Sequence, residues 1–164
     1  MQVDFFNKEC QKITYKDKFG ICDDLDLNAK TPAYLDFLNT DNWLVEIINS
    51  SPPREIIFTA IDHCILKYDK MIDNPSRCDA MLTYNNSIVF VELKNKLKKP
   101  AQIAQLENTI RLFFENNLNM IFSKKEAYLS NKKKTVFLSQ DTKDKFMQEN
   151  NGFRLYFSTV IVIE

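Results

Sequence analysis

The sequence contains little glycine, no excess of either charge and no long apolar run. Only 2 of its 164 residues are glycine, whereas 45% are hydrophobic and 27% are charged. This composition is typical of a globular protein and excludes a fibrous or disordered chain. Lysine plus arginine and aspartate plus glutamate each number 22, so bulk charge does not indicate a nucleic-acid binder, and any such surface must be local.

Signals for export and for membrane insertion are missing as well. Residues 1–10 include an acidic side chain and no apolar stretch of the kind found in signal peptides. No segment approaches the roughly 18 uninterrupted apolar residues of a membrane span. We therefore expect a cytoplasmic protein with no membrane partner. One domain is expected over 1–164, with an N-terminal extension of uncertain structure over 1–50 and a core over 54–164.

The four cysteines lack the C-x-x-C spacing of zinc sites and redox motifs. Cys64 falls on the apolar side of a predicted helix, and the others, Cys10, Cys22 and Cys78, are scattered along the chain. The pattern predicts buried thiols in a reducing compartment rather than zinc ligands or disulfides.

The spacing of apolar residues predicts a mixed α/β fold. Helices are expected over 31–49 as one or two short segments, from Ser51 to about Met71, and over 100–117; strands are expected in a hairpin over 77–96, over 135–139 and over 153–163. The last run is nearly continuous in apolar residues, as in a strand buried on both faces. The helix from Ser51 would carry the single histidine, His63, for which a surface or packing role is expected; the alternative is a general acid or base near Asp62.

The hairpin Arg77–Lys96 has a register that its turn determines. Asn85-Asn86 tolerates the positive φ angles of a tight two-residue turn, which pairs Tyr84 with Ser87. All pairs farther along the hairpin follow from this one. A slip by one residue would move every side chain to the other face of the sheet.

Two carboxylates face each other in this register. Asp79 falls opposite Glu92, and Lys94 shares their face because strand side chains alternate. Met81 and Phe90 are also expected opposite each other on that face, so the face is at least partly buried. Like charges that face each other across a sheet repel. We therefore predict that the pair holds a divalent cation; the alternative is a solvated face on which Lys94 neutralises Glu92.

The predicted cation site has suitable ligands for phosphodiester hydrolysis. Mg²⁺ takes oxygen ligands and keeps several waters, so Asp79, Glu92 and the backbone carbonyl of Leu93 suffice from the protein. Lys94, beside the cation, would orient or deprotonate an attacking water or neutralise charge on the phosphate.

These residues resemble the PD-(D/E)xK nuclease superfamily, whose core hairpin carries an aspartate on one strand and Glu-x-Lys on the next. Here the pattern reads Asp79, then Glu92-Leu93-Lys94, and the similar segment covers 54–116. The resemblance implies a restriction-endonuclease-like fold, a mixed β-sheet with an antiparallel hairpin at its core and flanking helices. It also implies a Mg²⁺- or Mn²⁺-dependent nuclease that hydrolyses phosphodiester bonds, with DNA as the expected substrate.

Other features of that family are matched in part. Some branches place a glutamine before a leucine on the helix after Glu-x-Lys; Gln105-Leu106 resembles this pair, which implies a catalytic role for Gln105 near the lysine or the scissile phosphate. Many branches draw a glutamate from the first helix into the metal site, for which Glu46 and Glu55 are candidates. Family members often have a further strand before the aspartate strand; here it is either missing or supplied by the N-terminal segment.

Basic residues beside the hairpin are candidates for nucleic-acid contacts. Lys96, Lys98 and Lys99 lead from the Glu-x-Lys strand into the next helix, where Gln102 follows, and these residues would contact phosphates. A solvated loop is the alternative. The rival function is a nuclease-like binding module without catalysis, acting through a protein or nucleic-acid partner in a defence or mobile-element system. The apolar run 153–163 would also permit a homodimer through edge-strand pairing.

Overall fold

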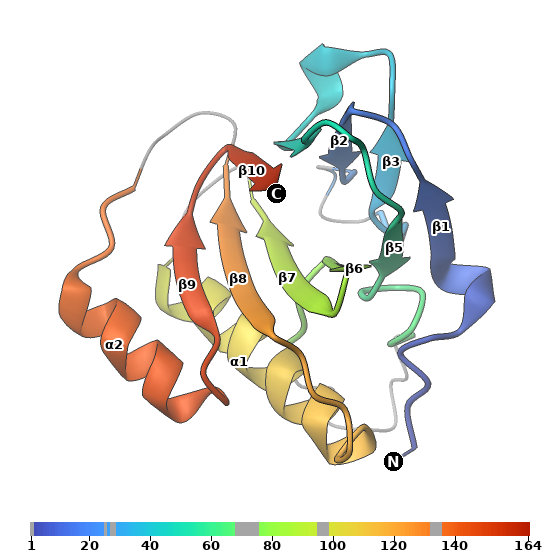
Figure 1. The fold of residues 1–164 in the computed structure, drawn as a ribbon. Helices are drawn as coiled ribbons and strands as arrows, with labels where there is room; N and C mark the ends of the chain where they lie inside the picture. Colours follow the sequence, from blue (N-terminus) through green and yellow to red (C-terminus); the bar gives the residue numbers. More distant parts are fainter. Residues whose placement is uncertain (1, 25, 27–28, 68–75, 95–98, 132–135) are drawn as a thin grey trace.

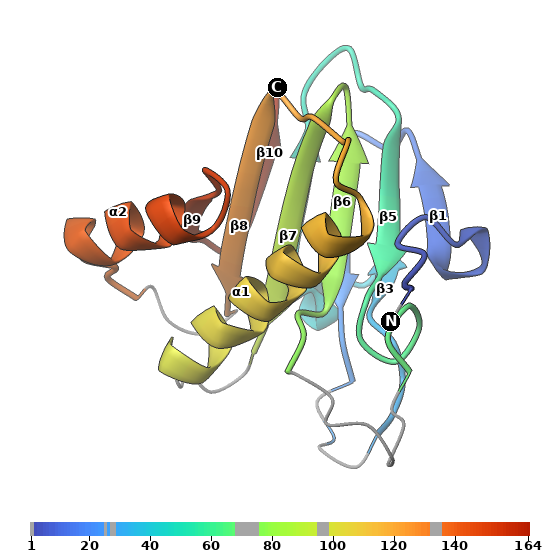
Figure 2. The same ribbon diagram turned by 90° about the horizontal axis from the view of Figure 1, so that it is seen from below.

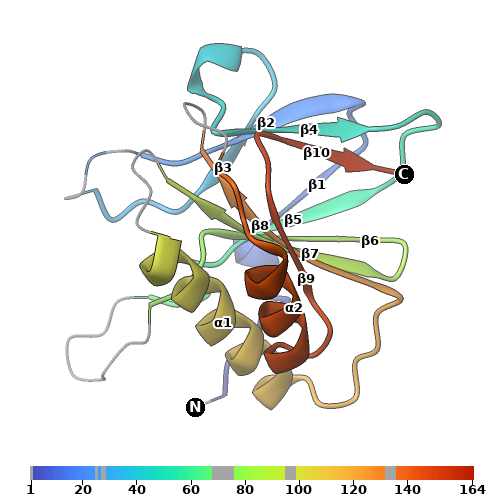
Figure 3. The ribbon, with the colours of Figure 1, turned by 90° about the vertical axis from the view of Figure 1, so that its left-hand side faces the viewer.

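The computed structural model describes residues 2–24, 26, 29–67, 76–94, 99–131 and 136–164, which form three layers. A four-stranded sheet packs on one face of a six-stranded sheet, and the two α-helices of the described chain cover the opposite face (Figure 1, Figure 3). The expected mixed α and β class is thus present, but a second sheet covers one face where helices are expected. None of the described helices has both the length and the apolar character needed to cross a membrane.

The larger sheet is antiparallel in one half and parallel in the other. Its strands follow in the order β1 (Gln11–Thr14), β5 (Ile56–Ala60), β6 (Ala80–Tyr84), β7 (Ser87–Leu93), β8 (Lys124–Ser130) and β9 (Arg154–Phe157). Neighbours from β1 to β7 are antiparallel, whereas β7, β8 and β9 run parallel to one another. Parallel strands need crossover connections, which contain α1 (Lys99–Asn116) and α2 (Gln140–Glu149) on the same face (Figure 2, Figure 3).

The smaller sheet combines strands from both ends of the chain. Its order is β10 (Val160–Ile163), β4 (Val45–Asn49), β2 (Lys18–Cys22) and β3 (Tyr34–Asp36), with β10 parallel to β4 and the other pairs antiparallel. Two short 3₁₀ helices, η1 (Lys8–Cys10) and η2 (Thr40–Asn42), complete the described elements. Segment 1–50 therefore supplies one strand to the larger sheet and three to the smaller one.

Side chains of β7 alternate between two cores. Val89 and Val91 pack toward the smaller sheet, whereas Ile88 and Phe90 pack toward the helices. Phe90 contacts Phe113 of α1, with ring centroids 5.7 Å apart. Each fully buried apolar side chain of this size contributes about 1.5–3 kcal/mol. A register slip in β7 would therefore disturb both cores at once.

The helix expected from Ser51 to Met71 is wrong over its described part. Residues 56–60 form β5, which pairs with β1 and β6, and residues 61–66 form a tight turn. The reason is burial on both faces, because the apolar run of β5 then lacks the alternation that marks a half-exposed strand. β5 precedes β6 in the sequence and lies beside it in the sheet, so the strand next to β6 is neither missing nor supplied by residues 1–50.

Other segments also differ from the expected elements, although the helix expected over 100–117 is confirmed as α1. Segment 31–49 contains β3, η2 and β4 in place of α-helices. Residues 136–139 are irregular rather than a strand, and residue 135 lies outside the described part. The run 153–163 forms two strands, β9 and β10, that belong to different sheets. Apolar runs of this kind do not specify the sheet that they join, because non-local partners decide it.

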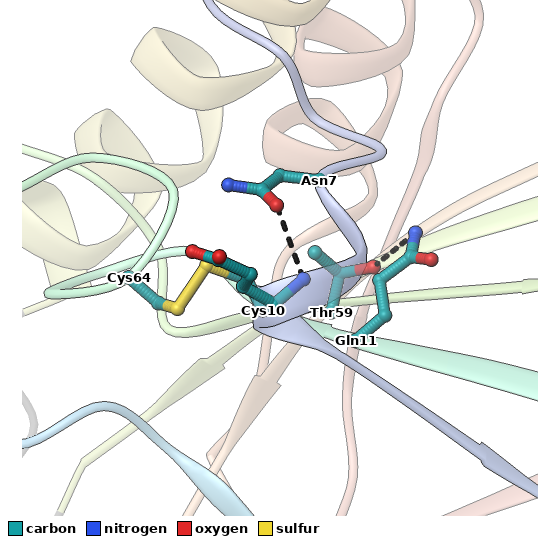
Figure 4. Close-up of a disulfide and its surroundings, with 6 residues drawn as sticks. Asn7, Cys10, Gln11, Thr59 and Cys64 are labelled. Carbon is teal, nitrogen blue, oxygen red and sulfur yellow. Dashed lines mark hydrogen bonds between the residues drawn. A yellow bond between two sulfur atoms is a disulfide. The ribbon is translucent and has the colours of Figure 1, made fainter.

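A disulfide joins Cys10 to Cys64, so the expectation of a thiol is wrong for these two residues (Figure 4). Cys10 ends η1 and Cys64 lies in the 61–66 turn, with Cα atoms 5.7 Å apart, within the usual reach of a disulfide. The two cysteines are 54 residues apart, and they meet because β1 pairs with β5, which the cysteine spacing does not indicate. Cys22 and Cys78 are buried outside any disulfide, as expected.

Replacing both bridged cysteines, Cys10→Ser with Cys64→Ser, should lower the free energy of unfolding. A cross-link over 54 residues removes chain entropy from the unfolded state and stabilises the fold by up to about 4 kcal/mol. Urea unfolding of the oxidised wild type and the double variant measures the difference. A thiol reductant should move the wild type toward the double variant and leave the variant unchanged. Equal midpoints in all samples would contradict a stabilising bridge.

Candidate functional site

The β6–β7 hairpin has the predicted register. The pairing runs from Tyr84–Ser87 at the turn to Ala80–Val91 at the other end. The two asparagines of the turn have φ angles of 40° and 58°, the left-handed values that a tight two-residue turn requires. The next position beyond the last pair is occupied by Asp79 on one strand and by Glu92 on the other.

Asp79 and Glu92 are both buried at this end of the hairpin, with exposed fractions of 4% and 0%. Asp79 is bound to β7 twice: its N–H donates to Val91 O at 3.2 Å, and its Oδ2 accepts from Leu93 N–H at 2.6 Å. Within the described chain, Glu92 Oε2 has no hydrogen-bond partner, and the partner of Glu92 Oε1 is the ammonium group of Lys94. An ionised carboxylate is costly in such surroundings unless a positive charge or further donors compensate it.

Lys94 follows β7 and places its ammonium group against this pair. The Lys94 N–H donates to Ser130 O at 3.0 Å, which continues the contact between β7 and β8. Nζ forms an ion pair with Glu92 Oε1 at 3.1 Å, although the Lys94 side chain is 37% exposed. Asp79, Glu92 and Lys94 therefore lie together at one end of the larger sheet.

Burial dominates the electrostatics of the pair. It raises the pKa of Asp79 to about 7, against the opposing effects of Lys94 and of the Leu93 N–H. Burial also raises the pKa of Glu92 well above its ordinary value, and the Asp79 charge adds to the rise. Burial lowers the pKa of Lys94, but Glu92 and Asp79 together outweigh this effect and the net shift is upward. Without a cation, the carboxylate pair therefore retains protons near neutral pH, and Lys94 keeps its own.

A third carboxylate reaches the site from the smaller sheet. Asp23 directly follows β2, and its pKa is raised by burial and by Asp62, whereas Lys94 and His63 lower it. Asp23 in turn raises the pKa of Asp79. The sequence shows only a local run of aspartates at this position. The contribution of Asp23 depends on how the two sheets pack, which no local signal indicates.

A partly buried ion pair, Asp62 with Arg77, acts on the carboxylates. Arg77 Nε donates to Asp62 Oδ1 at 2.6 Å, and the Arg77 side chain is 8% exposed. The other oxygen of Asp62, Oδ2, lies 3.3 Å from His63 Nε2. The charge of Asp62 also raises the pKa of Asp79. Asp62 and Arg77 are not identified as site residues from the sequence. A helix is predicted over the segment that contains Asp62, whereas the structure has a turn there, and this turn brings the two residues together.

Helix α1 holds the segment that leads into β6. Gln105 Nε2 donates to Arg77 O at 3.0 Å, and Thr109 Oγ1 accepts from Cys78 N–H at 2.9 Å. Thr109 is 1% exposed, so its hydroxyl is a buried partner of that N–H. The side chain of Gln105, the predicted catalytic glutamine, is thus hydrogen-bonded to the main chain of Arg77, next to the site. Its role near a lysine or phosphate stays a prediction.

The predicted nucleic-acid contacts are placed only in part. Lys96 and Lys98 lie outside the described residues, and Lys99 is the first residue of α1. Gln102 is 3% exposed, and its Oε1 has no hydrogen-bond partner within the described chain. Gln102 is therefore a buried polar group of the α1 interface and does not lie on an open surface.

The two glutamate candidates for the metal site have other partners. Glu46 on β4 forms an ion pair with Lys18 at 3.2 Å. Glu55, just before β5, accepts a hydrogen bond from the Tyr15 hydroxyl. In the described residues, the additional carboxylates that act on the pair are those of Asp23 and Asp62.

No three or more His, Cys, Asp or Glu side chains in the described ranges lie close enough together to form a metal-binding group. Asp79 and Glu92 therefore form a pair of carboxylates rather than a complete protein cage. Comparisons with known proteins add no assignment, because no family model, curated protein or solved structure matches the chain. The site is interpreted from its own geometry.

Replacing Asp79 with asparagine should stabilise the protein at high pH and not at low pH. Between its unfolded value of 3.8 and its folded pKa of about 7, Asp79 binds more protons in the folded state. The free energy of unfolding therefore falls as pH rises through this window, by at most about 4 kcal/mol. Asparagine keeps an acceptor for Leu93 N–H but does not ionise.

Urea unfolding with a chelator present, at pH values on either side of this window, measures the effect. The advantage of Asp79→Asn over the wild type should be largest at the alkaline end and vanish at the acidic end. Asp141→Asn, at an exposed position of α2, is the matched control and should show no such trend. A constant difference between Asp79→Asn and the wild type at all pH values would rule out the raised pKa.

Proposed function

We propose that the protein is a metal-dependent nuclease that hydrolyses phosphodiester bonds, with DNA as the expected substrate. The main support is Glu92, which is fully buried directly beside the buried Asp79, with Lys94 as its ion-pair partner at Oε1 and no hydrogen-bond partner at Oε2 within the described chain. A fold optimised for stability alone would not place two carboxylates there, since each is costly to ionise. Strongly perturbed carboxyl groups of this kind cluster at functional sites.

The donor set fits a hard divalent cation. Within the described chain, Glu92 Oε2 has no hydrogen-bond partner and Glu92 Oε1 lies 3.1 Å from Lys94 Nζ, whereas Asp79 accepts from Leu93 N–H through Oδ2. Asp79, Glu92 and the backbone carbonyl of Leu93 would hold the ion. Mg²⁺ and Mn²⁺ accept such oxygen ligands, and Mg²⁺ commonly keeps several waters, so a site with two carboxylates suffices.

The formal charges around the pair fit the same ion. The acidic side chains that interact here are Asp23, Asp62, Asp79 and Glu92, and the permanently basic ones are Lys94 and Arg77. When all are ionised, this part of the described chain carries an excess of two negative charges. One divalent cation would balance that excess, and it would also lower the pKa values that burial raises.

Each residue of the site has a distinct part in the proposed reaction. A bound cation would polarise the phosphate and lower the pKa of a water molecule. Lys94 carries a proton in the cation-free site, so its ammonium group supplies positive charge for the phosphate and a donor to orient the water. Asp79 and Glu92 are held in place by the hairpin, and Asp79 is further fixed by Leu93 N–H.

Cleavage of labelled DNA tests the proposal directly. Single-stranded, duplex and branched DNA, with RNA as a comparison, are incubated with and without Mg²⁺. The wild type should cut at least one substrate only when Mg²⁺ is present. Asp79→Asn, Glu92→Gln and Lys94→Met should each lower the rate by at least about 100-fold. Lys145→Met, on the exposed side of α2, is the matched control and should retain full activity.

A calorimetric titration with Mn²⁺ separates catalysis from binding alone. The nuclease proposal expects uptake at one site in the wild type and its loss in Glu92→Gln. If the wild type takes up no Mn²⁺ and cuts no substrate, the proposal is wrong, and a binding module becomes the better interpretation. Uptake of Mn²⁺ with cleavage that the three variants leave intact would place the reaction elsewhere in the molecule.

A further inference from the structure

The 61–66 turn lies directly against the candidate site. Ile61 N–H donates to Asp79 O at 2.9 Å, so the turn begins beside the first carboxylate. Leu66 N–H donates back to Ile61 O at 2.9 Å, and a bridge between Asp62 and Leu66 closes the turn. The two residues that follow Ile61, Asp62 and His63, are therefore held at the end of the sheet where Asp79 lies.

The turn is fixed on two sides. Asp62 Oδ1 accepts a hydrogen bond from the buried Arg77 Nε at 2.6 Å. Cys64, the residue after His63, is bonded to Cys10 at the start of β1 (Figure 4). An ion pair on one side of His63 and a covalent bond on the other leave this residue little freedom to move.

His63 occupies a backbone conformation that is unfavourable for it. Its φ angle is 61°, in the left-handed region, which costs an L-residue other than glycine about 1–2 kcal/mol. Its Nε2 lies 3.3 Å from Asp62 Oδ2, and the side chain is 23% exposed, so part of the ring is open to solvent. Residues held in such strained conformations cluster at functional sites.

The basic groups near the carboxylates all have acidic partners. Arg77 is paired with Asp62, Lys94 with Glu92, and His63 Nε2 lies 3.3 Å from Asp62 Oδ2. Asp23 follows β2 of the smaller sheet, and both Lys94 and His63 lower its pKa, so both groups act on the same carboxylate. A phosphodiester that enters an acidic site needs donors in addition to a cation. The His63 side chain is 23% exposed, and its second ring nitrogen, Nδ1, can donate a hydrogen bond when it carries the proton, while Nε2 faces Asp62.

We propose that His63 contacts the phosphate of the nucleic-acid substrate, and that Asp62, held by Arg77, is the positioning residue for its imidazole. This inference rests on the proposed nuclease function. It gives the 61–66 turn, which begins at the hydrogen bond from Ile61 N–H to Asp79 O, a part in substrate binding.

NMR of the full-length, disulfide-bonded protein tests the contact without any cleavage. His63 is the single histidine of the chain, so every histidine ring signal in the spectrum belongs to it. Thymidine bisphosphate with Ca²⁺ is the probe. The His63 ring signals should shift as this probe is added. Their shift should level off at the same probe concentration as the shifts of the other signals that the probe affects. Ring signals that stay unmoved at saturation would overturn the proposal.

The kinetic test uses His63→Asn, because asparagine tolerates a positive φ and removes the imidazole. Loss of a phosphate contact that is present in both ground and transition states should raise KM by about 10-fold and leave kcat largely unchanged. Mn²⁺ uptake and the unfolding midpoint should equal those of the wild type. An unchanged KM would contradict a phosphate contact.

Asp62→Ala, and the double variant that combines Asp62→Ala with His63→Asn, show whether Asp62 acts through His63. If it does, the double variant should have the same KM as His63→Asn, whereas independent effects would add. A protein that takes up Mn²⁺ and cuts DNA while its His63 signals stay unmoved defeats this inference alone. A protein with neither Mn²⁺ uptake nor cleavage defeats the nuclease proposal, and this inference with it.

Discussion

The burial of Glu92 on β7 is the constraint on which the site depends. β7 is an interior strand of the larger sheet, and its alternate side chains fill the cores on both faces. Glu92 takes the place of an apolar side chain on the face that includes Phe90. A slip by one residue would bury it against the smaller sheet and move the valines toward the helices, so both cores oppose the slip. The core packing thus holds the carboxylate where its ionisation is costly.

The parts of the site that the sequence predicts are those that depend on local geometry. Two asparagines with positive φ set the hairpin turn, and the opposition of Asp79 and Glu92 follows from strand periodicity alone. Helix α1 is similarly marked by its proline start and apolar stripe. By contrast, β5 is buried on both faces, and its apolar run resembles a helix face until its partners β1 and β6 are known.

The remaining parts depend on contacts between distant segments. Asp23 reaches the site because the smaller sheet packs on the larger one, and Asp62 reaches it through a turn that follows β5. The disulfide joins residues 54 positions apart, and its formation depends on the pairing of β1 with β5. None of these contacts produces a periodic signal in one sequence. The hairpin therefore contains only some of the acidic groups of the site, which come from both sheets.

Stability and cation occupancy are linked in such a site. Burial raises the pKa of both carboxyl groups, so the empty site loses stability as pH rises and its protons leave. A ligand that binds only the folded state adds RT ln(1 + [L]/Kd) to the free energy of unfolding. A divalent cation would thus offset the penalty that the ionised pair imposes. The disulfide and the Asp62–Arg77 pair hold the segments around the carboxylates in place independently of any cation.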